Sequence, residues 1–250
     1  MADFRHLVDQ ARGEGMAIEL YELALRKDGG HTSSTTGYVS SAYATRQVRI
    51  VLDGGGALLE PGALQYAKGR LKIDVQKAQG AGGLLRRQVV SAGTGDAAFA
   101  TRYSGHGEVW TEPTRGHFVL ASMDGPEDSL ILDDGAFYAC EGTVELGHHT
   151  HRSVSGVLSG NGLVQPKLTG RGVFIVESPV PVEEIEAIEM DGTDELIVDG
   201  DVMLMYSATL TVELRPLVSG LRNAARSGEG LVFRFTGTGT VWLTPTARVH

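Results

Sequence analysis

SGHGEVW, at residues 104–110, is the stretch that decides the fold, because the chain repeats related versions of it twice more. They are TGRGVFI at residues 169–175 and TGTGTVW at residues 236–242. The first glycine of the motif stands at 105, 170 and 237, so neighbouring copies are separated by 65 and 67 residues. This spacing exceeds the roughly 20–50 residues of common solenoid units, so each copy is predicted to contain several strands.

The motif is predicted to make a tight turn and then supply a core residue. Glycines at alternate positions permit positive φ angles or a close backbone approach between two strands. Three residues after the second glycine, every copy holds a large apolar residue, as a closed three-lobed β core requires. The predicted anchors of the repeat are Gly105, Gly107, Trp110, Gly170, Gly172, Ile175, Gly237, Gly239 and Trp242.

A second element recurs ahead of each copy of the motif. It reads LLEPGAL at 58–64, ILDDGAF at 131–137 and IVDGDVM at 197–203. Aliphatic residues, an acid, turn-forming residues and further apolar residues indicate a strand, a tight turn and a second strand. The recurring acids are predicted to be turn residues, with a shared binding function as the alternative: Glu60, Asp133 and Asp199.

These patterns predict an all-β domain over residues 45–250 with pseudo-threefold internal symmetry. The three repeats span about 45–117, 118–184 and 185–250. Residues 1–44 are outside the repeat and form an N-terminal extension. Within it, Phe4, Leu7, Val8 and Ala11 have the spacing of a short amphipathic helix. Residues 16–25 fit either a strand or a short helix, and the Gly/Ser/Thr-rich stretch 28–41 is predicted to be a loop.

Composition narrows the class of protein. The formal net charge of −9 disfavours nucleic acid as a partner, because phosphates are repelled by a field of that sign. The single cysteine, Cys140, excludes an internal disulfide framework and fits a reducing compartment. No apolar run approaches the roughly 18 residues of a membrane span, and the first residues do not resemble a secretion signal. We therefore expect a cytoplasmic protein without a transmembrane segment.

Three stretches together resemble a known family. Residues 57–64, 130–137 and 228–243 are similar to the altered-inheritance-of-mitochondria family, long described in bacteria as a domain of unknown function. The resemblance covers about residues 46–246. It implies a fold like that of the tryptophan RNA-binding attenuation protein. Fungal relatives are mitochondrial inner-membrane proteins, bacterial relatives have no established activity, and the family supplies no catalytic residues to transfer.

Two clusters carry specific chemistry. His148, His149 and His151 form the most metal-like group, since imidazoles suit zinc, copper, iron or nickel. No glutamate follows at the spacing of a cupin-type site, and a solvated strand end is the alternative. The second cluster is an apolar tip with basic flanks in residues 82–87, which would suit weak contact with an anionic bilayer. Its contact residues are Leu84, Leu85, Arg86 and Arg87.

The sequence contains no recognisable catalytic motif. The Gly-x-Gly motif lacks the third glycine and the following helix of a dinucleotide fingerprint, and no nucleophile elbow is present. We therefore assign no catalytic residue and no cofactor, and predict a non-catalytic β scaffold or protein-interaction module. Its protein partner is unidentified, and self-association into a homo-oligomer through exposed strand edges is part of this hypothesis. The alternatives are a peripheral membrane adaptor acting through the Gly82–Arg87 tip and a metal- or small-molecule-binding protein using the histidine cluster.

Overall fold

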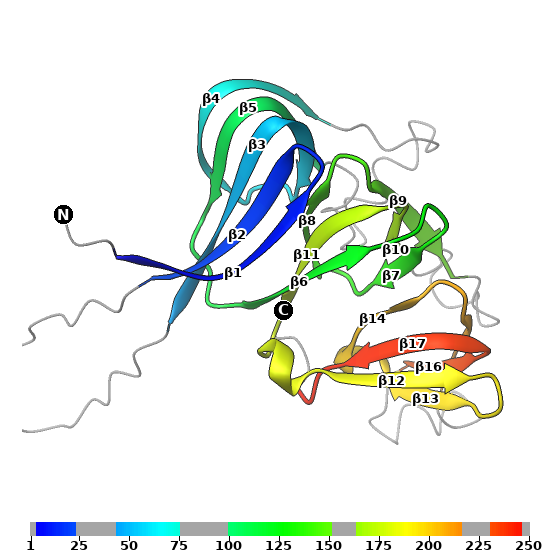
Figure 1. Ribbon diagram of the computed structural model, residues 1–250. Coiled ribbons are helices and arrows are strands. Elements are labelled where there is room, and N and C mark those ends of the chain that lie inside the picture. The colour runs from blue at the N-terminus through cyan, green and yellow to red at the C-terminus, as the bar shows by residue number, and fades with distance from the viewer. Residues whose placement is uncertain (1–3, 24–43, 76–99, 152–163, 217–230, 247–250) are drawn as a thin grey trace, which may run out of the picture.

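The computed structural model describes residues 4–23, 44–75, 100–151, 164–216 and 231–246, and most of these residues lie in antiparallel strands (Figure 1). The predicted all-β class is confirmed. Residues 84–87 and 28–41 are outside this description. The elements are β1 (Arg5–Gly13), β2 (Met16–Leu23), β3 (Thr45–Leu59), β4 (Leu64–Val75), β5 (Thr101–Thr111), β6 (His117–Met123), β7 (Ser129–Leu132), β8 (Phe137–Glu141), β9 (Glu145–Thr150), β10 (Val164–Thr169), β11 (Gly172–Ser178), η1 (Val182–Glu184), β12 (Glu186–Asp191), β13 (Leu196–Asp199), η2 (Gly200–Val202), β14 (Met203–Ser207), β15 (Thr211–Pro216), β16 (Leu231–Thr236) and β17 (Thr238–Leu243).

The predicted N-terminal helix is wrong, because residues 5–13 form strand β1. β1 pairs with β2 along its length, and β2 in turn pairs with β3 from Met16↔Leu52 to Leu23↔Thr45. The apolar residues that suggested a helical face remain largely exposed; Leu7, for example, is 49% exposed. Residues 5–13 form a strand because their backbone groups pair with those of β2. The spacing of apolar residues within the segment does not reveal this pairing. The described part of the extension is thus continuous with the sheet of β3.

After β2, the strands fall into three successive groups, called units here, whose pairings can be compared. The middle unit comprises β6–β11, where β11 pairs with β6 and β8, and β10 pairs with β7 and β9. In the last unit, β12–β17, β17 pairs with β12 and β14, and β16 pairs with β13 and β15. The first unit, β3–β5, makes the same pairings with longer strands, since β5 pairs with β3 and with β4 along its length.

Neighbouring units are joined by short edge pairings. β3 of the first unit pairs with β8 of the middle unit at Leu58↔Cys140. β7 of the middle unit pairs with β14 of the last unit at Ile131↔Tyr206. Each junction has the same flanking backbone bond: the Glu60 amide donates to the Tyr138 carbonyl at 2.8 Å, and the Asp133 amide donates to the Leu204 carbonyl at 2.9 Å. One type of junction therefore occurs twice.

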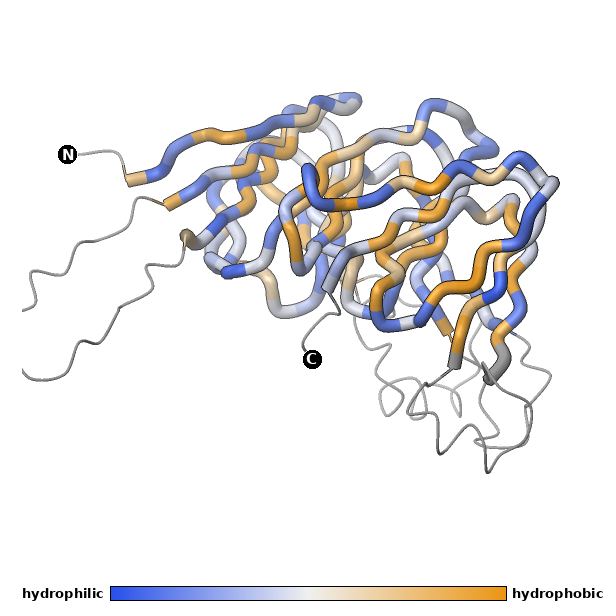
Figure 2. The backbone as a smooth tube through the Cα atoms, turned by 90° about the horizontal axis from the view of Figure 1, so that it is seen from below, coloured by the Kyte–Doolittle hydropathy of each residue, from blue (hydrophilic) through white to orange (hydrophobic). Residues whose placement is uncertain are grey.

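Side-chain alternation along these strands builds three clusters of buried apolar residues, and Figure 2 shows the alternating hydrophobic and hydrophilic positions. Ile175 is fully buried beside residues of β3 and β5. Trp110 is almost buried, but it lies under Arg5, whose guanidinium is 4.2 Å from the ring centroid, and beside Tyr66. Trp242 is only partly buried. The three positions therefore have three different surroundings.

The motif glycines are required by backbone geometry at the first copy. Gly105 and Gly107 have φ angles of 116° and 157°. A Cβ atom at Gly105 would lie 2.4 Å from the Arg70 carbonyl oxygen, and one at Gly107 would lie 2.3 Å from the Lys68 carbonyl oxygen. Neither contact can be relieved by a flexible side chain, so β4 and β5 can approach this closely only at glycine.

Candidate functional site

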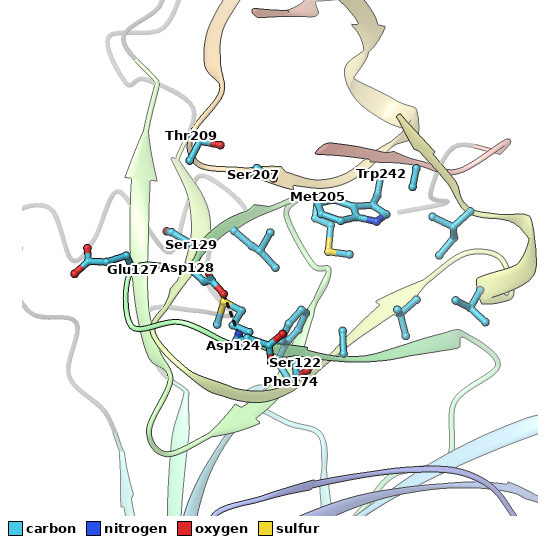
Figure 3. Close-up of a pocket in the computed structure, with 17 residues that line it drawn as sticks. Ser122, Asp124, Glu127, Asp128, Ser129, Phe174, Met205, Ser207, Thr209 and Trp242 are labelled. Atoms are coloured by element: carbon cyan, nitrogen blue, oxygen red, sulfur yellow. Dashed lines mark hydrogen bonds between the residues drawn. The ribbon is translucent and has the colours of Figure 1, made fainter. Parts of the chain in front are cut away.

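A pocket of about 530 Å³ lies between the middle and last units. Strands β6, β7, β11, β12, β14 and β17 and the short helix η1 contribute to its wall. In Figure 3, Trp242 and Met205 lie on one side of the pocket and Phe174 on the other. The volume is within the range of roughly 300–1,000 Å³ that is usual for small-molecule sites. The apolar wall consists of Val119, Ala121, Met123, Leu130, Phe174, Val182, Ile185, Ala187, Met205 and Trp242.

The pocket has an acidic rim held in place by backbone hydrogen bonds. The Asp128 carboxylate accepts the amides of Asp124 and Gly125, each at 2.9 Å. The Asp128 carbonyl accepts the Gly170 amide at 3.0 Å, which ties the rim to the second copy of the glycine motif. Asp124 and Glu127 remain exposed, and Figure 3 shows Glu127 pointing away from the cavity. A partner that enters this pocket therefore meets negative charge at the rim.

Two of the serines that line the pocket form hydrogen bonds with the backbone. Ser129 Oγ donates to the Leu168 carbonyl at 3.1 Å, and Ser207 Oγ accepts the Thr240 amide at 3.0 Å. No His, Cys, Lys or Arg is among the residues that line it. The carboxylates of Asp124, Glu127 and Asp128 are the titratable groups among these lining residues.

The histidine cluster lies elsewhere, at the end of β9 and just beyond it. His151 is buried, with Nε2 at 2.8 Å from Gln165 Oε1 and 2.9 Å from Tyr206 Oη. The ring of His149 packs edge-on against that of His151, with centroids 4.5 Å apart, and His148 Nε2 is buried without a hydrogen-bond partner. Within the described ranges, no three His, Cys, Asp or Glu side chains are grouped to hold a metal ion.

Burial also controls the protonation of these imidazoles. Desolvation lowers the pKa of His148, His149 and His151 below the ordinary value of 6.5, and His117 shifts in the same direction for the same reason. All four are therefore held toward the neutral form. His151 is a buried core histidine whose Nε2 is hydrogen-bonded to Gln165 and Tyr206. The sequence could not show that residues 14 and 55 positions away meet it.

Asp199, Arg102 and Arg234 make local structural contacts. Asp199 accepts the Asp201 amide at 3.1 Å and caps η2, in line with its predicted turn role. Arg234 forms ion pairs with Glu195 and Glu213, and Arg102 donates to the Gly142 carbonyl at 3.3 Å. The basic tip, Leu84, Leu85, Arg86 and Arg87, lies outside the described residues. Among the residues described, no helix is long and apolar enough to cross a membrane.

A family model for mitochondrial biogenesis AIM24 matches residues 39–246, which is most of the chain and includes all three units. The chain belongs to the mitochondrial biogenesis AIM24 family. The predicted family is thus confirmed. The match begins after β1 and β2, so the hairpin that covers Trp110 is outside the AIM24 match.

Solved structures support the fold. The crystal structure of a protein from Streptococcus pyogenes matches this AIM24-family chain with a TM-score of 0.60 and 21% sequence identity. The match covers 85% of this chain and 93% of the streptococcal chain. At that identity the likeness concerns the fold alone. No curated protein matches the sequence.

Proposed function

We propose that this AIM24-family protein is a non-catalytic β scaffold and protein-interaction module built from three equivalent units, with a fold resembling the tryptophan RNA-binding attenuation protein. Strand register supports the equivalence. Trp110, Ile175 and Trp242 lie opposite Tyr66, Ala139 and Met205, respectively. One residue further, the register shifts at the same point in all three pairs: Leu64/Tyr66, Ile175/Val176 and Met203/Met205. Bulges are specific features, and a threefold coincidence favours an internal repeat.

The pocket between the middle and last units carries the proposed function. Its apolar wall includes Phe174, Met205 and the partly buried Trp242, and its rim is acidic. Aromatic side chains in a concave site provide large contact areas, and rim charges select the partner's sign. We therefore propose that it accepts an aliphatic or aromatic side chain of a partner protein, presented by a segment with flanking basic residues.

Fluorescence of Trp242 tests this proposal. In a Trp110→Phe background, Trp242 is the remaining tryptophan, because the chain contains two. A tetrapeptide of leucine and phenylalanine flanked by arginines is expected to change the emission saturably, while the same peptide flanked by glutamates has little effect. Ala187→Phe, which fills the pocket wall, should abolish the response. Equal responses to both peptides, or an unchanged response in the Ala187→Phe protein, would contradict the proposed site.

The two alternative functions rest on less structure. The membrane adaptor depends on Leu84–Arg87, which are not described, so it stays a proposal from sequence. Metal binding would have to use His148, His149 and His151, although His151 Nε2 is already bonded within the core. Native mass spectrometry of untagged protein with added zinc separates metal binding from the interaction-module proposal, because a stoichiometric metal adduct is expected only for the former.

A further inference from the structure

If the junction between units is extended to the two ends of the molecule, each end has one strand whose equivalent is paired in the internal junctions. Each unit has one strand before its acidic turn and one strand after it. In both internal junctions, the strand before the turn of one unit pairs with the strand after the turn of the next unit: β3 with β8, and β7 with β14. β13 is the corresponding first strand in the last unit, and the start of β4 is the corresponding second strand in the first unit. In the described part of the chain, β13 pairs with β16 alone and β4 with β5 alone. Figure 1 shows β4 and β13 at opposite ends of the molecule.

Burial at the equivalent positions supports this comparison. Leu58 and Ile131, which lie in the two junctions, are 0% and 3% exposed, whereas their equivalent Ile197 in β13 is 50% exposed. All five residues of β8 are buried, and four of the five in β14 are buried. The equivalent residues at the start of β4, from Leu64 to Lys68, are all exposed. Ile197 in β13 and Leu64 and Tyr66 at the start of β4 are thus apolar residues at junction positions that remain exposed, while Val198 is buried within its own unit.

The two ends also have opposite charge. Residues 191–201, which contain β13 and its flanks, include five acidic residues and no basic one. β4 contains three basic residues, Lys68, Arg70 and Lys72, and one acid, Asp74. Opposite charges across a contact steer association and fix its register. The exposed edges therefore suit each other better than either suits a second copy of itself.

We propose that β13 of one molecule pairs antiparallel with β4 of a second copy, repeating the internal junction between molecules. The internal registers determine the new one: Ile197 faces Ala67, Val198 faces Tyr66 and Leu196 faces Lys68. The Asp199 amide then donates to the Gln65 carbonyl, as Glu60 and Asp133 donate inside the chain. The contact joins different surfaces of the two copies, so it propagates head to tail and either closes into a ring or continues as a filament. This inference rests on the unit equivalence proposed above, and it does not involve the pocket.

Cysteine cross-linking between separately purified variants tests the pairing. Cys140 is buried, so its thiol does not compete. An Ala67→Cys protein mixed with an Ile197→Cys protein under mild oxidation is expected to give a covalent dimer, and each variant alone much less. Ala67→Cys mixed with Glu145→Cys is the matched control, since Glu145 is exposed on β9, another strand with one unpaired edge. A yield from the Ile197→Cys mixture no greater than the control would overturn the proposal.

Two further measurements remove ambiguity. Ile197→Asp changes an exposed residue and should keep the folded circular dichroism spectrum, while it lowers the light-scattering mass toward that of one chain. High salt is expected to lower the mass of the unmodified protein, because the edges attract through charge. If the Ala67→Cys/Ile197→Cys double variant cross-links within single chains, the ends meet internally and pairing between copies is wrong. The tryptophan fluorescence response of the pocket is independent of all these outcomes.

Discussion

His151 illustrates how a residue with apparent metal chemistry is used as a structural group. It lies at the end of a histidine-rich stretch, yet it is buried against Phe233 and bonded to Gln165 and Tyr206. Satisfied polar groups of this kind are costly to disturb in a low-dielectric core. The cluster therefore affects stability through protonation.

Stability is expected to fall as the pH decreases from 7 to 5.5. Burial lowers the folded-state pKa of His148, His149 and His151, so below about 6.5 the unfolded chain binds more protons than the folded chain. Each additional proton bound by the unfolded state contributes about 1.4 kcal/mol per pH unit. His151→Asn removes one such site and should flatten the slope in urea titrations at successive pH values. Identical slopes would contradict neutral burial of His151.

The equivalent residues Trp110 and Trp242 show what the sequence could and could not predict. The repeat of glycines and large apolar residues predicts that both are core anchors after a tight turn, and the two residues lie in β5 and β17. Their surroundings depend on residues far away in the chain: Arg5 and Tyr21 contact Trp110, whereas Trp242 lines a pocket with Phe174 and Ile185. The glycine motif therefore predicts that each tryptophan follows a turn in a strand. It does not predict whether another element covers the tryptophan side chain.

At the scale of elements, the predicted all-β class is confirmed, and the predicted helix in the extension is wrong. Residues 4–11 satisfied a helical spacing, but β1 is an edge strand that leaves Leu7 and Val8 exposed. Its conformation is decided by pairing with β2, which is itself held by β3. The pocket was also missed, because its wall combines residues 119–130, 174, 182–187 and 205–242.

The turn between β1 and β2 gives a prediction at this scale. Gly15 has a φ of 68°, and a Cβ there would lie 2.8 Å from the Gly55 amide nitrogen. Gly62 has a φ of 85°, but nothing lies within 4 Å of its Cβ position. Gly62→Ala should therefore cost only the backbone strain of about 1–2 kcal/mol. Gly15→Ala should cost a further ~1–3 kcal/mol from the clash.

Urea denaturation of the two variants measures the difference. A larger loss for Gly15→Ala would show that close packing of the hairpin on β3 contributes to global stability. Equal losses would mean that the hairpin shifts freely and that its contact with residues 53–55 is not part of the stable core.

In the proposed arrangement, the whole molecule is a series of three units joined by one type of edge pairing. In the part of the chain that the structure describes, β13 and β4 each keep one unpaired edge. Large open sheets are normally protected at their edges, because unpaired amides and carbonyls invite association. Here the open edges are short, opposite in charge and equivalent to edges that are paired internally. The proposed pairing between copies does not involve the pocket, so the two proposed contacts are compatible.

Amide hydrogen exchange measures that organisation most directly. The amides of Glu60 and Asp133 donate across the two internal junctions and should be protected at every protein concentration. The Asp199 amide, their equivalent, should exchange quickly in dilute protein and become protected as the concentration rises, together with the residues around Gln65 in β4. Rapid exchange of Asp199 at all concentrations, with Glu60 and Asp133 protected throughout, would contradict a third junction between molecules.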